Sequence, residues 1–309
     1  MGKYAIKKEF LFSELFTFPI IEPVLPLAEK ALGLLVTLPR SDRNVKVKRI
    51  RIPVRDAYIN ALLYTPLTLE NEKNAPLLVY YHGGGFIYKS APHHFRLMKQ
   101  YASFTPCKVL LVDYRVAPAH KFPVPVNDCY DALKWAYRNP IFLGIDKNRI
   151  AIMGDSAGGA LTGGVALLAR DSGEVPICAM ELIYPVTDCR MQTQSMKEFT
   201  DTPVWNAKLS KKMWELYMPA ADKDKMCYGA PALAADFSNL PDSYTETAEF
   251  DSLRDEGVNL YKSMLNAGNN AVLYETKGTI HAFDMTSQSK ITKEAVARRA
   301  GFLNNKFYK

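Results

Sequence analysis

The chain alternates short, continuous apolar runs with segments of helical periodicity, and this alternation restricts its fold more than any other feature. Runs such as Leu77–Tyr81 and Val109–Asp113 have the length of strands and lack a polar face. Strands of this kind are covered by helices on both sides of a mostly parallel sheet. We therefore predict an α/β fold with strands at 45–54, 58–65, 77–81, 109–113, 149–153, 177–184, 244–250 and 271–275, and helices at 127–137, 157–170, 255–267 and 290–307.

Two helical segments interrupt the alternation. The first lies before Arg40, and the second, Gln192–Met226, carries several aromatic side chains. The first segment cannot bury its apolar side alone, so we expect both segments to pack over the sheet as a helical cap. The predicted division is 1–44 as the N-terminal part of the cap, 45–190 as the α/β core, 191–230 as the cap insertion and 231–309 as the C-terminal part of the core.

The net charge of +7 would permit an acidic partner. The densest basic run lies within 45–55, where basic residues alternate with valine and isoleucine; its members are Lys46, Lys48, Arg49, Arg51 and Arg55. That pattern is typical of a strand with one solvated face, whereas a nucleic-acid surface gathers basic residues on one patch. We therefore expect an exposed edge strand and no nucleic-acid partner.

Cysteine usage and the apolar profile indicate the compartment. The five cysteines contain no C-x-x-C pair and lie mostly in apolar stretches, which favours buried free thiols in a reducing compartment. No apolar run is long enough to span a bilayer, and Glu14 and Pro19 break the apolar stretch near the N-terminus. We expect a cytoplasmic protein without stable membrane insertion.

The sharpest local signal is the pentapeptide Gly154-Asp155-Ser156-Ala157-Gly158, between a predicted strand and a predicted helix. A serine on a tight strand-to-helix turn, flanked by glycines that leave it room, is the arrangement of a nucleophile. The pentapeptide alone is weak evidence, because a serine can also cap a helix. Its place in a strand–turn–helix unit favours the nucleophile.

A serine nucleophile needs a histidine as general base and a carboxylate that orients the base. In α/β folds with this motif the order along the chain is serine, acid, histidine. Four of the five histidines precede Ser156, which leaves His281 as the base. Asp251 directly follows a predicted strand, where open sheets build their sites; Asp188 also follows a strand and is the second choice.

A second glycine motif, HGGGF at 82–86, follows the apolar strand Leu77–Tyr81. Consecutive glycines let backbone amides approach a ligand oxygen and stabilise its negative charge. A flexible turn is the alternative, but two glycine motifs directly after buried strands argue against coincidence. We predict no metal site, because HExxH is absent and His93 and His94 lack the i, i+4 spacing of two ligands on one helix face.

Six motifs together resemble the hormone-sensitive lipase family of α/β-hydrolase esterases. In chain order they are HGGGF at 82–86, DYRVAP at 113–118, GDSAGG at 154–159, YPVTD at 184–188, DSLRDEG at 251–257 and HAF at 281–283. This set is highly specific and covers the chain from about Leu77 to Phe283. The resemblance implies an α/β-hydrolase fold and a carboxylesterase that acts on short- to medium-chain acyl esters without a cofactor.

The resemblance also assigns the site. It implies Ser156, Asp251 and His281 as the catalytic triad, and so favours Asp251 over Asp188. The backbone amides that it assigns to the oxyanion hole belong to Gly84, Gly85 and Ala157. Three residues would support this loop, and the histidine among them would brace it rather than act as a base: His82, Gly83 and Asp155.

The resemblance places cap helices over the acyl pocket. We interpret the cap aromatics as cap core rather than substrate contacts, on ordinary aromatic burial; they are Phe12, Phe16, Trp205, Trp214 and Tyr217. Three positions depart from the family pattern: Ala119 replaces a glutamate, Lys89 a glycine and Ser252 a proline. None removes a catalytic group, but the first questions an ion pair beneath the site, and Lys89 can alter the loop beside the oxyanion hole.

Two alternative functions stay open. A serine peptidase or amidase would use the same residues, and a non-catalytic small-molecule receptor could share the fold. The receptor predicts a damaged triad, whereas all three members can be assigned here. A homodimer is also left open.

Overall fold

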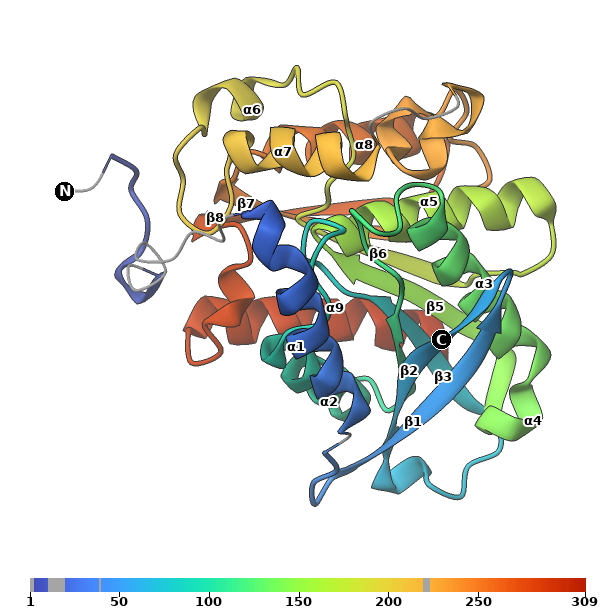
Figure 1. The fold of residues 1–309 in the computed structure, drawn as a ribbon. Helices are drawn as coiled ribbons and strands as arrows, with labels where there is room; N and C mark the ends of the chain where they lie inside the picture. Colours follow the sequence, from blue (N-terminus) through green and yellow to red (C-terminus); the bar gives the residue numbers. More distant parts are fainter. Residues whose placement is uncertain (1–2, 11–19, 39, 219–222) are drawn as a thin grey trace.

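The computed structural model describes residues 3–10, 20–38, 40–218 and 223–309. Within these residues eight strands form one sheet in the order β1-β2-β4-β3-β5-β6-β7-β8 (Figure 1). β2 is antiparallel to both of its neighbours, and the strands from β4 to β8 in this order run parallel. The strands are β1 (Val45–Val54), β2 (Ala57–Pro66), β3 (Ala75–Tyr81), β4 (Lys108–Asp113), β5 (Ile145–Asp155), β6 (Ala179–Ile183), β7 (Ser243–Phe250) and β8 (Ala271–Ile280).

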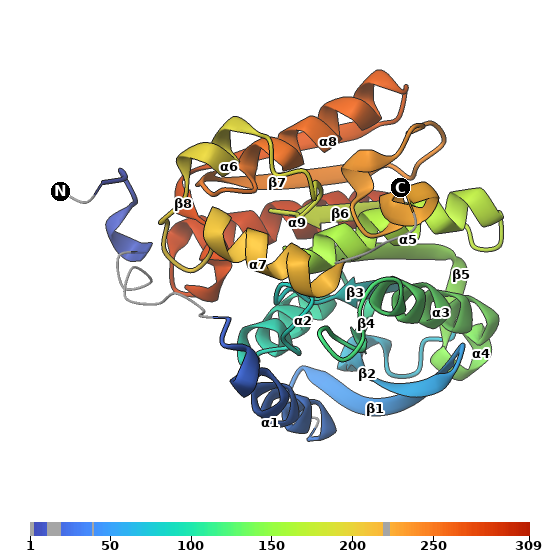
Figure 2. The same ribbon diagram turned by 45° about the horizontal axis from the view of Figure 1, so that its top comes forward.

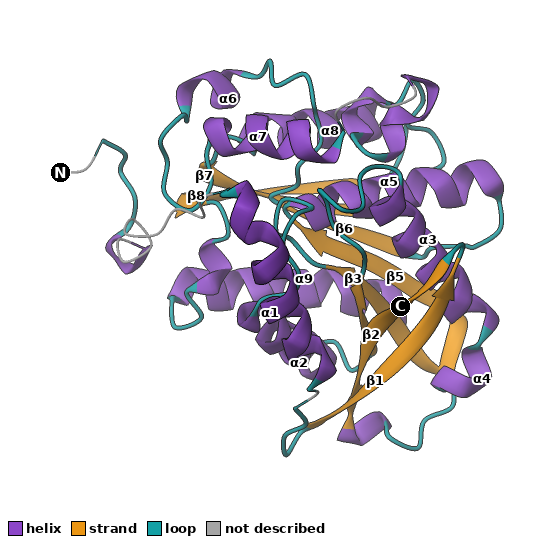
Figure 3. Cartoon of the chain, in the orientation of Figure 1, coloured by secondary structure: helices purple, strands orange, loops and turns teal. Residues whose placement is uncertain are grey.

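Helices cover both faces of the sheet (Figures 2 and 3). Alternate residues of each buried strand contribute to two separate apolar cores, as the pleat of a strand requires. In β3, Leu77 and Val79 belong to one core and Leu78 and Tyr80 to the other. The first core is closed by α3 (Val124–Arg138), α5 (Ala157–Ser172) and α8 (Arg254–Asn266), and the second by α2 (Pro92–Phe104) and α9 (Lys290–Tyr308). The predicted mostly parallel α/β sheet is thereby confirmed.

Two differences from the prediction affect the surroundings of the site. Helix α2 was not predicted, although Pro92 at its first position is a common helix start. Strand β8 continues to Ile280 instead of ending at Glu275, because it passes Gly278 (φ 73°) and still pairs with Phe250 of β7. His281 therefore follows the strand directly rather than six residues later.

The two segments predicted as a cap contain α1 (Leu25–Thr37), α6 (Gln194–Glu198) and α7 (Ala207–Tyr217). The cap boundaries stay a prediction, and Phe12 and Phe16 lie outside the described residues. The shorter elements are α4 (Pro140–Leu143) and the 3₁₀ turns Glu22–Val24, Leu67–Leu69, Lys223–Tyr228, Pro231–Leu233 and Phe283–Met285.

The basic run lies on β1, which forms one edge of the sheet. Lys46, Lys48, Arg49 and Arg51 are exposed, while the intervening valines and isoleucines are buried.

None of the described helices has the length and apolarity needed to cross a membrane. All five cysteines lie in described residues and are free thiols.

A buried ion cluster joins α9 to β7 and to the turn after β8. Arg299 of α9 is 1% exposed; it donates to Asp284 Oδ2 at 2.7 Å and to Glu246 Oε1 at 2.5 Å. The hydroxyls of Tyr184 and Tyr244 donate to the second oxygens of Asp284 and Glu246. Because both carboxylates are almost fully buried, each depends on the shared guanidinium for compensation.

We expect Arg299→Met to lower the free energy of unfolding by about 3–5 kcal/mol, because it leaves the buried Asp284 carboxylate without a cation and Glu246 with only the more distant Arg298, at 3.9 Å. Urea denaturation monitored by circular dichroism measures this change. The matched control is Arg138→Met, which breaks an exposed pair with Glu174 and is expected to cost less than about 1 kcal/mol. Equal losses in the two variants would contradict the role given to the cluster.

Candidate active site

Ser156 lies on the turn between the end of β5 and the start of α5 (Figure 1). Its backbone has a φ of 56°, a conformation that costs a residue with a side chain about 1–3 kcal/mol. The neighbouring glycines are required by close approach: a Cβ at Gly154 would lie 2.2 Å from the carbonyl oxygen of Gly158, and one at Gly158 1.9 Å from that of Tyr81. The sequence pattern thus reflects a tight, strained turn that presents the serine.

His281 and Asp251 extend a hydrogen-bonded chain from this serine. His281 Nε2 lies 2.9 Å from Ser156 Oγ, and its Nδ1 lies 2.7 Å from Asp251 Oδ2. A proton on Nδ1, donated to the carboxylate, leaves Nε2 free to accept the serine proton. Asp251 is completely buried, and its other oxygen accepts a hydrogen bond from the amide of Leu253.

Asp188, the second choice for the acid, lies elsewhere in the hydrogen-bond pattern. Both of its carboxylate oxygens accept hydrogen bonds from Arg190, at 2.8 Å each. Asp251 is therefore the carboxylate that contacts His281.

The glycine loop after β3 supplies backbone amides beside the serine. Gly84 and Gly85 have φ values of 121° and 61°. A Cβ at Gly85 would lie 2.8 Å from the Trp205 ring, so glycine is needed for space as well as for conformation. Among the described residues, no acceptor is bonded to the amides of Gly84, Gly85 or Ala157. The amide of Ala157 is also at the start of α5, where the helix dipole favours negative charge.

Asp155 links the nucleophile turn to the glycine loop. Its Oδ1 accepts hydrogen bonds from the amide of Gly83 at 2.9 Å and from the hydroxyl of Tyr80 at 2.7 Å. Its Oδ2 lies 3.2 Å from His94 Nε2, which carries the ring proton because His94 Nδ1 accepts from the amide of Ala91. Burial alone would raise the pKa of Asp155, but His94 and the Tyr80 hydroxyl hold this pKa below its usual range.

His82 lies under the same loop. Its Nδ1 is 2.8 Å from the carbonyl oxygen of Gly83, and its ring stacks on Tyr114, with centroids 4.2 Å apart. Burial lowers the pKa of His82 to about 3, so the ring is neutral near pH 7. Its contacts fix the loop rather than reach Ser156.

Among the described residues, the side chains of His93, His94 and Asp155 are close enough together to suggest a metal site. Their possible ligand atoms lie within 4.8 Å of one another. Both nitrogens of His94 and both oxygens of Asp155 already take part in hydrogen bonds. These bonds occupy the ligand atoms of His94 and Asp155, which are therefore members of a hydrogen-bond network.

Ser156 and His281 open into a cavity of about 370 Å³. The cap contributes Ala28, Ala31 and Leu32 of α1, together with Trp205, whose ring centroid lies 6.1 Å from that of His281. Trp205 is a buried core residue, 5% exposed, and one side of it also faces the cavity; the interpretation of the cap aromatics as core rather than substrate contacts stays a prediction.

Two other cap aromatics, Trp214 and Tyr217, pack on Phe86 instead of lining the cavity. The Tyr217 ring is stacked on that of Phe86, with centroids 3.8 Å apart. These two side chains thus secure the cap to the end of the glycine motif.

Lys89 ties the glycine loop to the end of β4. Its ammonium donates to the carbonyl oxygen of Tyr114 at 2.6 Å and lies 3.2 Å from Asp113 Oδ1. The side chain also lines the catalytic cavity. A buried cation at this position therefore holds the loop in place.

Sequence reasoning missed the support behind His281. The ring of Tyr184 packs edge-on against the imidazole at 4.9 Å, and its hydroxyl binds Asp284, just after His281 in the chain. Arg96 donates to the carbonyl oxygens of Asp284 and Met285. The sequence held a partial signal, because Tyr184 opens the YPVTD motif, but nothing local indicated its contact with the histidine.

The comparisons with known proteins decide the family. A family model described as the α/β hydrolase fold matches residues 78–285. The chain belongs to the α/β-hydrolase fold family. It is 34% identical to the carboxylesterase NlhH of Mycobacterium tuberculosis over 235 residues, which cover 75% of this chain and 71% of that protein. It is also 32% identical to an arylesterase of Saccharolobus solfataricus, over 78% of this α/β hydrolase and 76% of the relative.

Solved structures of esterases share this α/β-hydrolase architecture over nearly the whole chain. A bacterial heroin esterase superposes with a TM-score of 0.87 at 30% identity and covers 99% of both chains. A thermostable esterase of Pseudomonas putida superposes with a TM-score of 0.89 at 26% identity, over 100% of both chains. The superposition therefore extends over the segments that were predicted as a cap, as well as over the sheet and its helices.

We expect Gly158→Ala to slow phosphonylation of Ser156 by a fluorophosphonate probe about 100-fold, because a Cβ would push the turn away from the Tyr81 carbonyl and misplace the nucleophile. Labelling rates read by intact-mass spectrometry measure the effect. The control is Gly301→Ala in α9, where an added Cβ meets nothing within 4 Å. The control should react at the wild-type rate; equal slowing of both variants would refute the steric argument.

Proposed function

We propose that this α/β hydrolase is a serine carboxylesterase of the hormone-sensitive lipase type, acting on short- to medium-chain acyl esters through an acyl-enzyme on Ser156. The observation that carries the proposal is the hydrogen-bonded chain from Ser156 through His281 to Asp251 at the wall of an apolar cavity. The reaction class is that of the named relatives: the chain is a carboxylic ester hydrolase.

Acylation begins when Ser156 Oγ attacks the ester carbonyl. His281 Nε2 takes the hydroxyl proton, and the buried Asp251 carboxylate stabilises the imidazolium that forms. The carbonyl oxygen of the tetrahedral intermediate becomes negative and is held by the amides of Gly84, Gly85 and Ala157. Removal of one such donor costs about 3 kcal/mol in comparable sites.

Collapse of this intermediate breaks the ester bond. His281 returns its proton to the leaving alcohol, and the acyl group stays on Ser156. Water then attacks the acyl carbonyl, again with His281 as the base, and the carboxylic acid leaves with the serine restored. No step requires a cofactor.

The cavity supports the substrate range. Its volume of about 370 Å³ is near the lower end of ligand pockets, about 300–1,000 Å³. The walls from α1 are alanine and leucine side chains, which favour an alkyl group over a charged one. With this function we propose a cytoplasmic location. Cys107 and Cys129 are fully buried free thiols, which are typical of proteins in a reducing compartment.

A chain-length series of nitrophenyl esters tests the function. We expect kcat/KM to be highest for short and medium acyl groups and to fall for long ones, because the cavity is small. Ser156→Ala should abolish turnover of every member, a loss on the order of a million-fold in kcat. Wild-type rates in this variant would refute the nucleophile, and faster cleavage of matching anilides would favour an amidase.

The acid is tested separately with Asp251→Asn. We expect kcat to fall about 10⁴-fold, because the asparagine stabilises the wrong tautomer of His281. Asp188→Asn is the matched control: the same change in the rival carboxylate, which pairs with Arg190, should leave kcat within a few-fold of wild type. The reverse pattern would move the acid to Asp188.

A further inference from the structure

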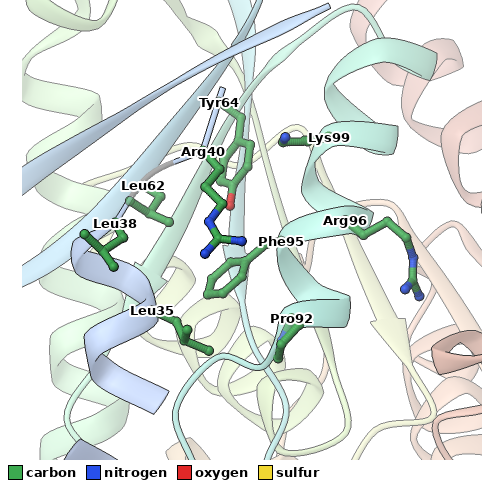
Figure 4. A pocket seen from close by; sticks show the side chains of 9 residues that line it. All are labelled: Leu35, Leu38, Arg40, Leu62, Tyr64, Pro92, Phe95, Arg96 and Lys99. Carbon is green, nitrogen blue, oxygen red and sulfur yellow. The ribbon is translucent and has the colours of Figure 1, made fainter. Parts of the chain in front are cut away.

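A second cavity adjoins the catalytic one and shares helix α1 with it. It lies between α1, α2 and β2 and has a volume of about 350 Å³ (Figure 4). Ala31 and Leu32 line the catalytic cavity, whereas the second is lined by Leu35, one turn farther along α1, and by Leu38, directly after the helix. Nothing in the ester chemistry uses this second space.

The body of the second cavity is apolar. Leu35, Leu62 and Phe95 direct their side chains toward one another across it, and Pro92 closes one side (Figure 4). Surfaces of this kind bind alkyl groups, since each buried methylene contributes to affinity.

One polar group is aimed into this space. The Tyr64 side chain is only 1% exposed, and Figure 4 shows its hydroxyl directed into the cavity. Within the described part of the chain this hydroxyl has no hydrogen-bond partner. A ligand oxygen in this largely apolar space would give the hydroxyl an acceptor that the described residues do not supply. Burial also raises the pKa of Tyr64, so the hydroxyl keeps its proton near neutral pH.

A cation lies at the same end. Arg40 lines the same cavity as Tyr64, and its side chain extends into this space (Figure 4); no carboxylate of the described residues pairs with it. The other two cations of the lining are engaged: Lys99 pairs with Asp42 at 2.8 Å, and Arg96 turns away to backbone carbonyl oxygens. Among the described residues Arg40 is thus an exposed cation without an acidic partner.

We propose that the second cavity binds an alkyl carboxylate, with its chain between Leu35, Leu62 and Phe95 and its carboxylate on Tyr64 and Arg40. A carboxylate has one oxygen for the hydroxyl and one for the guanidinium, which makes both bonds charge-assisted. The proposal does not rest on the ester-hydrolase assignment, because it concerns binding at a different place.

A carboxylate bound in the second cavity should stabilise helix α1. Only Leu25 and Val36 of this helix are buried, while Leu34 is 60% exposed and Leu38, directly after the helix, is 56% exposed. A chain packed against Leu35 and Leu38 adds contacts to a helix that has few. Because α1 also lines the catalytic cavity, a carboxylate bound here would influence the wall of the acyl pocket.

Octanoate is the probe, titrated calorimetrically into protein whose Ser156 has been phosphonylated so that the catalytic cavity is filled. We expect one site. Tyr64→Phe should raise the Kd about 10-fold, since a hydrogen bond to a charged group is lost, and Arg40→Gln about threefold, since this side chain is exposed. The double variant carrying both changes should bind octanoate at least 10-fold more weakly than wild type.

The matched control is the double variant Tyr58→Phe with Arg43→Gln, which makes the same chemical changes at exposed residues outside the cavity. It should bind octanoate as wild type does. Amide hydrogen exchange in α1 should slow with octanoate in the phosphonylated protein, in proportion to occupancy. Circular dichroism confirms that each variant is folded.

Absence of octanoate binding, or equal affinity in wild type and in the Tyr64→Phe, Arg40→Gln double variant, would overturn the proposal. Failure of the ester-hydrolase assignment is seen separately, because intact-mass spectrometry would then show no phosphonyl adduct before any titration. In that case the same variants are compared in unmodified protein. A higher Kd for octanoate in the Tyr64→Phe variant than in wild type still supports the site.

Discussion

The site depends on a contact between two backbones, the first turn of α5 against the carboxyl end of β3. Gly158 approaches so closely that a Cβ there would lie 1.9 Å from the carbonyl oxygen of Tyr81. HGGGF begins at the next residue, so this contact places Ser156 beside the glycine loop. Two motifs far apart in the chain are therefore parts of one structure, and the nucleophile motif tolerates no side chain at Gly158, where they meet.

Residues that do not take part in the reaction position the glycine loop, the nucleophile and the histidine. Asp155 accepts hydrogen bonds from both the glycine loop and His94, and so couples the positions of nucleophile and loop. On the other side, Tyr184 packs against His281 and binds Asp284, which Arg299 anchors to α9. Supporting shells of this kind keep reacting groups within the narrow geometry that catalysis needs.

Local patterns in the sequence predicted the strands and the positions of Ser156, Asp251 and His281, because each residue follows a strand at the same edge of the sheet. The end of β8 was placed too early, because Lys277 and Gly278 break the apolar pattern although pairing with β7 continues. The contact of Trp205 with the glycine loop could not be predicted, because it arises where the cap packs on the core.

The hydrogen-bond partners of buried polar groups could also not be predicted from the sequence. The bond between His94 and Asp155 depends on α2, a helix that was not predicted, and the Arg299 cluster joins residues that lie 15 and 53 positions apart. Hydrogen bonds between distant residues have no local signature, whereas a glycine required by a close approach does.

The most direct test of the account is mass spectrometry of the wild-type protein quenched with acid during turnover of nitrophenyl acetate, followed by peptide mapping. The account predicts that an acetyl group is found on the hydroxyl of Ser156 and disappears once the substrate is consumed. An acetyl group on another residue, or full turnover with no acetylated species at any quench time, would contradict it.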